Sequence, residues 1–115
     1  MANNMVIAGD YEGKGVGVSV KGPFISIKLG KMLILDKSSL ESYEVITEET
    51  QKSAASGVAR GLVGGALLGP VGMLAGGLSA KNKKSVVMVL QFKDGKKSLV
   101  EVNDNVYKAI IQKMF

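Results

Sequence analysis

The sequence predicts an α+β fold: a small antiparallel curved sheet or partial barrel, a C-terminal helix, and an inserted glycine-rich α-helical hairpin. Three observations predict it. Apolar β-branched residues alternate with other residues over much of 16–29, which is typical of strands. Asp94 and Gly95 separate two β-rich runs, which is a strong signal for a hairpin. The last residues, 103–115, carry the apolar periodicity of a helix.

The strands follow one another with short turns between them. A short apolar run begins at residue 5, and Val16, Val18 and Val20 then recur with the period of two that a strand requires. The alternation continues through Phe24 or Ile25, Ile27 and Leu29. We expect breaks at 22–23 and 30–31, a turn at 37–39, and further strands over 32–36, 38–49, 85–92 and 98–102.

The C-terminal helix has both a start signal and an apolar side. Asn103 or Asp104 can cap its first turn. The apolar residues that share one side are Val106, Ile110, Ile111 and Met114. This side is expected to close one open end of the sheet.

The stretches "FISIKLGKMLILDKSSLESYEVI", "VVMVLQFKDGKKSLVEV" and "NDNVYKAIIQKMF" follow one another in an order that resembles the bacterial pleckstrin-homology-like family, which is related to the GRAM domain. The resemblance covers the chain outside 50–82. Similar glycine-rich insertions occur in small proteins of Gram-positive bacteria and their prophages. The chain is then one domain over 1–115, in which 1–49 and 83–115 form the sheet and closing helix, and 50–82 form the inserted hairpin.

Residues 56–80 combine many glycines with apolar side chains. The glycines recur every four residues, at Gly57, Gly61, Gly65 and Gly69, and again past Pro70 at Gly72 and Gly76. On a helix this spacing forms a groove without side chains, which a second helix can approach closely. We expect one helix over 54–68 capped by Thr47 or Thr50, a break at 69–70, and a second helix over 71–80. A helix so rich in glycine is not stable alone and needs a partner surface, either from the rest of the chain or from another subunit. We expect a homo-oligomer held by this groove.

Residues 62–80 are uncharged and have about the length of a membrane span. A single span would separate the early strands from the late hairpin, and the arms of a helical hairpin are too short to cross a bilayer. The alternative is contact with an anionic membrane surface, with Lys81, Lys83 and Lys84 near lipid phosphates. Such a basic run is also typical of a solvated loop.

Arg60 is the only arginine of the chain and lies in an otherwise uncharged run. On the expected helix it shares one face with Ser53, Gly57 and Gly64, which adds a hydroxyl and bare backbone to the guanidinium fork. Such a face can bind a phosphate or carboxylate in bidentate fashion. The alternative is a pairing with a protein carboxylate, such as those at 48–49, or a solvent-exposed side chain.

Composition excludes several classes of function. The chain has no Cys and no His, which removes disulfides, a His-based triad and the usual zinc ligands. Neither "GKGVG" nor "GGALLG" matches a phosphate-binding loop, and the acidic residues form no evident catalytic pair. We therefore expect no enzyme, no metal and no cofactor. The net charge of +5 favours an anionic partner, while the few aromatic residues argue against nucleic acid.

The sequence thus predicts a non-enzymatic binding or scaffold protein that self-associates through the glycine-rich hairpin. One alternative is sequestration of a small anionic metabolite or nucleotide signal at Arg60, as small phage-encoded proteins do. The other is peripheral binding to an anionic membrane surface. The first residues lack the basic start and long apolar run of a signal peptide, so we expect a cytoplasmic protein.

Overall fold

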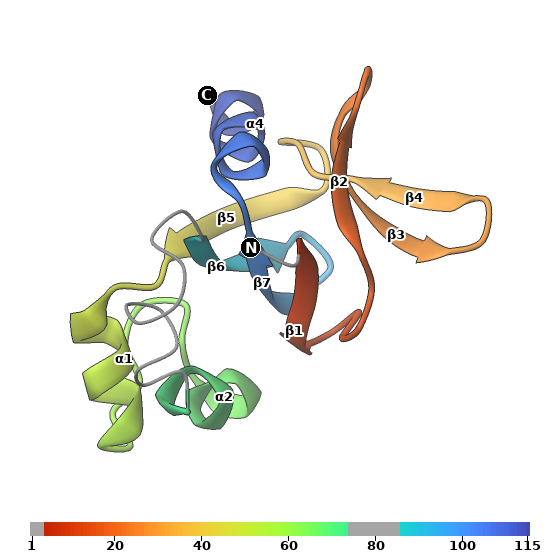
Figure 1. Cartoon of the computed structure of the whole chain (residues 1–115). Helices are drawn as coiled ribbons and strands as arrows, with labels where there is room; N and C mark the ends of the chain where they lie inside the picture. The colour runs from red at the N-terminus through yellow and green to blue at the C-terminus, as the bar shows by residue number, and fades with distance from the viewer. Residues whose placement is uncertain (1–3, 74–85) are drawn as a thin grey trace.

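The computed structural model describes residues 4–73 and 86–115, and it has two antiparallel sheets and a C-terminal helix (Figure 1). The four-stranded sheet has the order β1 (Met5–Gly9), β7 (Lys97–Val102), β6 (Val86–Phe92), β5 (Leu40–Val45). The three-stranded sheet has the order β2 (Val16–Ser19), β3 (Gly22–Lys28), β4 (Lys31–Ile34). The helical elements are α1 (Glu48–Ala55), the 3-10 helix η1 (Gly65–Leu67), α2 (Leu68–Gly72) and α4 (Asp104–Met114). The predicted α+β class is confirmed.

The two sheets join where β1 meets the residues just before β2. The amide of Val6 donates to the carbonyl of Lys14 (2.8 Å), and the amide of Val16 donates to the carbonyl of Asn4 (2.7 Å). On the other side, no strand ladder between β4 and β5 is present in residues 4–73 and 86–115. The architecture is therefore an open, partial barrel.

The main core fills the space between the sheets, and α4 closes it. Its buried residues include Val6, Val16, Ile25, Leu35, Leu40, Met88, Leu90, Val100, Val102, Val106 and Ile110. The Asn103 side chain accepts the amide of Val106 (2.9 Å) and so caps α4. Ile111 and Met114 pack at the margin of this core, so the apolar side predicted for the helix is confirmed.

The predicted hairpin at Asp94 and Gly95 is confirmed, and Gly95 takes the left-handed φ of +93° that the turn requires. The break expected at 22–23 is wrong by two residues. Gly22 begins β3, and the β2–β3 turn lies at 20–21. Val20 and Leu29 are therefore fully exposed at turns rather than buried on strands.

The second face of the four-stranded sheet is covered by the segment that follows β5. Strand residues Ala8, Val87, Val89 and Leu99 form a buried cluster with Ile46, Ala54, Val63, Leu67 and Val71 of that segment. Figure 1 shows α1 and α2 on the side of the sheet away from α4. Strand β6 is thus buried on both faces, because Met88 and Leu90 face the main core.

The helix expected over 54–68 is wrong, because α1 ends at Ala55. The amide of Gly57 donates to the carbonyl of Ala54 (3.0 Å), and the amide of Val58 donates to that of Ser53 (2.8 Å). With Gly57 at φ +82°, these bonds form a Schellman motif, which stops the helix. Thr47 is one of the two predicted caps, and its Oγ1 accepts the amide of Thr50 (3.2 Å), but the helix begins at Glu48 rather than at residue 54.

The break expected at 69–70 is also wrong. Pro70 is the third residue of α2, where its missing amide would have no acceptor within the helix. Gly72 allows α2 to approach α1 closely, because a Cβ there would lie 3.0 Å from the backbone of Ala55. The second expected helix, 71–80, lies mostly outside the described residues.

Replacing Leu67 with Ala should test whether the glycine-rich segment is part of the core. Leu67 is 1% exposed against the sheet, so Leu67→Ala should lower the free energy of unfolding by about 2–5 kcal/mol. Met73→Ala is the matched control, because Met73 is 86% exposed and its truncation should change stability by no more than about 0.5 kcal/mol. Urea unfolding measures both, and equal, small effects would contradict the packing.

Candidate binding sites

The glycines expected to form an oligomerisation groove do not share one helix face in the described part of the chain. Gly57, Gly61 and Gly65 have left-handed φ values of +82°, +59° and +53°; the first two lie at turns, and Gly65 begins η1. Gly69 and Gly72 lie on the short helix α2, and Gly76 lies outside the described residues. Self-association through these glycines stays a prediction.

Two charged side chains of the sheet hold the loop between α1 and η1. The amide of Leu62 donates to Glu44 Oε1 (3.0 Å), and Lys97 Nζ donates to the carbonyl of Leu62 (3.1 Å). Glu44 comes from β5 and Lys97 from β7, so the loop is fixed on either side of buried β6. Sequence reasoning missed both residues. A Cβ on Gly61 would collide with the Glu44 carboxylate, which explains glycine there.

Arg60 lies in this same loop, and its guanidinium pairs with a protein carboxylate. Arg60 Nη1 is 3.3 Å from Glu49 Oε1, and the two side chains are 51% and 76% exposed. The expected helical face with Ser53, Gly57 and Gly64 is not formed, because α1 ends before Gly57. The pairing with residues 48–49, the alternative that the sequence left open, is therefore the one found. Anion binding at Arg60 stays a prediction.

The basic run Lys81, Lys83 and Lys84 lies outside the described residues. Within residues 4–73 and 86–115, no helix is long and apolar enough to cross a membrane.

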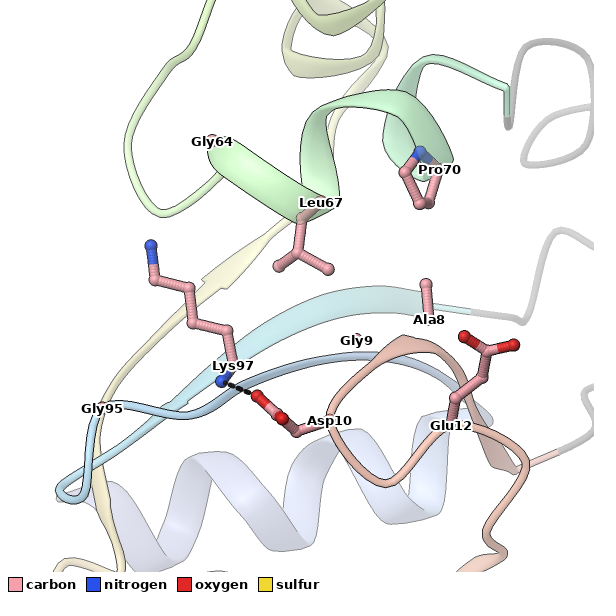
Figure 2. A pocket seen from close by; sticks show the side chains of 9 residues that line it. All are labelled: Ala8, Gly9, Asp10, Glu12, Gly64, Leu67, Pro70, Gly95 and Lys97. Atoms are coloured by element: carbon pink, nitrogen blue, oxygen red, sulfur yellow. Dashed lines mark hydrogen bonds between the residues drawn. The ribbon is translucent and has the colours of Figure 1, made fainter.

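A pocket of about 450 Å³ lies between the end of β1, the start of β7, and η1 and α2 (Figure 2). Its lining residues are Ala8, Gly9, Asp10, Glu12, Gly64, Leu67, Pro70, Gly95 and Lys97. Figure 2 shows Leu67 pointing into it from η1 and the Glu12 carboxylate reaching toward it from the opposite side. Asp10 Oδ2 accepts the backbone amide of Lys97 (3.0 Å). The rim therefore carries two carboxylates around an apolar and glycine-lined interior.

A second surface is formed by β2, β3 and β4 with their turns, which we call the basic sheet (residues 13–35). It holds Lys14, Lys21, Lys28 and Lys31 and no acidic residue. On its outer side, Phe24 lies across Gly17, where a Cβ would be 3.0 Å from the ring. Large apolar side chains of this segment are exposed on both faces and at the turns: Val18 shares the face of buried Val16, Met32 lies on the outer face, and Val20 and Leu29 lie at the turns. Of the described part of the chain, this surface has the most such side chains.

An antiparallel partial barrel closed by a C-terminal helix defines a pleckstrin-homology-like domain. A family model described as a glycine zipper containing PH domain matches residues 4–108, and the chain belongs to this family. The predicted pleckstrin-homology-like class is confirmed, while the relation to the GRAM domain and the bacterial origin stay predictions. No curated protein and no solved structure matches the chain. Domains of this class are typically binding modules without catalytic activity.

Comparing two alanine substitutions should separate the cost of a positive φ from the cost of losing the Glu44 contact. Gly65→Ala meets no atom within 4 Å and should cost only the backbone strain, about 1–2 kcal/mol. Gly61→Ala has the same backbone strain and also displaces Glu44 from the Leu62 amide. The loss of that hydrogen bond should lower the free energy of unfolding by about 1 kcal/mol more. Thermal unfolding of both variants measures the difference, and equal costs would show that Glu44 does not hold the loop.

Proposed function

We propose that the protein is a non-enzymatic binding module that docks on anionic membrane surfaces through the basic sheet. The observation that carries this proposal is the combination of lysines, exposed apolar turns and absent carboxylates in residues 13–35. Exposed apolar side chains beside charge of one sign are typical of an interaction site.

The charge is unevenly distributed along the chain. Residues 13–35 contribute four positive charges to a net charge of +5, whereas Asp10 and Glu12 make the preceding residues acidic. An ammonium group close to an anionic bilayer contributes about 1 kcal/mol of attraction. The basic sheet therefore has enough charge for a measurable affinity, and it has no carboxylate that would oppose it.

The apolar side chains lie beside the lysines in a way that suits the edge of a bilayer. Leu29 is fully exposed in the β3–β4 turn between Lys28 and Lys31, and Val20 is fully exposed beside Lys21. The two turns are at opposite ends of β3, about 20 Å apart for a strand of its length. A sheet lying flat on the membrane brings both turns to the lipid, with apolar tips inserted and ammonium groups at the phosphates.

The other functions expected from the sequence have less support. Anion sequestration at Arg60 has to compete with Glu49, which already contacts Nη1 of the guanidinium. Self-association through the glycine groove has to form a helix where the loop is bonded to Glu44 and Lys97. Membrane docking through the basic sheet requires no change in the described structure.

Sedimentation with lipid vesicles should test the proposal. The protein should bind phosphatidylcholine vesicles that contain phosphatidylglycerol and should not bind phosphatidylcholine alone. Lys28→Gln with Lys31→Gln should weaken binding about 30-fold, since two surface charges are lost. Leu29→Ser with Val20→Ser should weaken it at least about tenfold through the loss of apolar insertion.

Two control variants match these changes on other surfaces. Lys37→Gln with Lys52→Gln removes the same charge, and Val58→Ser with Met73→Ser removes exposed apolar side chains near the glycine-rich segment. Both controls should keep the larger part of the affinity. If the controls weaken vesicle binding as much as the basic-sheet variants do, binding depends on the overall charge and apolar content of the protein. The assignment of the basic sheet as the membrane-binding surface would then be wrong.

A further inference from the structure

We infer that the β3–β4 turn of one copy docks in the pocket between β1 and α2 of a second copy, which gives a head-to-tail assembly in solution. The inference goes beyond membrane docking, because it requires no lipid. It uses two features that lie on different parts of the molecule: an apolar turn flanked by lysines, and a pocket rimmed by carboxylates.

The β3–β4 turn projects from the surface of the molecule. The β3–β4 hairpin extends away from the rest of the chain (Figure 1). Leu29 at its end is fully exposed, and the paired residues Lys28 and Lys31 flank it. Gly30 has φ +78° with no atom within 4 Å of a Cβ position, so nothing in the described residues packs against the turn there.

The pocket offers the complementary surface. Leu67 and Ala8 lie at its base and are only 1% and 5% exposed, so the surface open to an incoming turn comes from Pro70 on one side and from the backbone of Gly9 on the other. A volume of about 450 Å³ accommodates a leucine side chain together with the glycine beside it. The accessible proline and glycine backbone are thus suited to the apolar tip rather than to the lysines.

The charges at the rim match those of the turn. Asp10 and Glu12 are exposed and take part in no ion pair within residues 4–73 and 86–115. The ammonium group of Lys97, the cation of the pocket, already donates to the carbonyl of Leu62 (3.1 Å). Two carboxylates therefore face the two lysines of an incoming turn, and opposite charges across an interface select the partner and its orientation.

The resulting contact joins two different surfaces, so each copy keeps one unused turn and one unused pocket. Such heterologous contacts form rings or open chains rather than closed dimers. Because the ion pairs are exposed, the assembly should weaken as salt is added.

Sedimentation velocity without lipid should test the inference, with two variants that each remove one surface. Lys28→Glu with Lys31→Glu changes the turn. Asp10→Asn with Glu12→Lys changes the rim while keeping an oxygen acceptor for the Lys97 amide. At low salt and up to about 1 mM protein, the wild type should grow in mass beyond a dimer, and each variant alone should associate at least tenfold more weakly.

An equimolar mixture of the two variants should associate again, because it pairs an unchanged turn with an unchanged rim. Lys37→Glu with Lys52→Glu is the charge-matched control and should associate like the wild type. Leu29→Ser changes a side chain without contacts in the fold and should weaken association even if a charge variant misfolds. A monomeric wild type, a variant that associates normally, or a mixture that stays monomeric would each overturn the inference. Since lipid is absent, these outcomes are independent of the vesicle result.

Discussion

The burial of β6 on both faces is the constraint on which the rest of the structure depends. Met88 and Leu90 require the partial barrel and α4 on one side, and Val87 and Val89 require a cover on the other. A four-stranded sheet with aliphatic residues on both faces is not stable in water without both layers. The glycine-rich segment supplies the second layer within the same chain. The outer side of the basic sheet takes no part in either buried cluster, and Met32 there is half exposed.

The elements that the sequence predicted correctly are those with local signals. The hairpin at Asp94 and Gly95 and the cap at Asn103 each depend on residues only a few positions apart. The path of 56–64 depends on distant residues, because Glu44 and Lys97 are 18 and 35 positions from Leu62. A four-residue glycine spacing fits a helical groove and a series of left-handed turns equally well. Gly57 followed by Val58 was the one local signal for the helix end.

Among the candidate sites, too, contacts between residues close in sequence were predictable and contacts between distant residues were not. The sequence predicted a carboxylate near 48–49 as an alternative partner of Arg60, because both lie in one short stretch. The pocket was not predictable, since it joins residues 8–12, 64–70 and 95–97 only through the fold. The exposed tips Val20 and Leu29 were assigned to strands from their alternation, although a turn breaks the alternation at that position. Alternation identifies which residues are apolar in a strand, but it does not locate the ends of that strand.

The pairing of β1 with β7 has a consequence for how the chain folds. Val6 opposes Val100, so the first strand finds its partner only after more than ninety further residues have been synthesised. Asn4 adds to this closure by accepting the amide of Asn103 (2.7 Å). Contacts of such long sequence separation slow folding, because the loop must close before the pairing contributes any stability. During synthesis, β1 and the segment after β5 therefore cannot pack until β6 and β7 have been made. Until then, their apolar residues are exposed and accessible to chaperones.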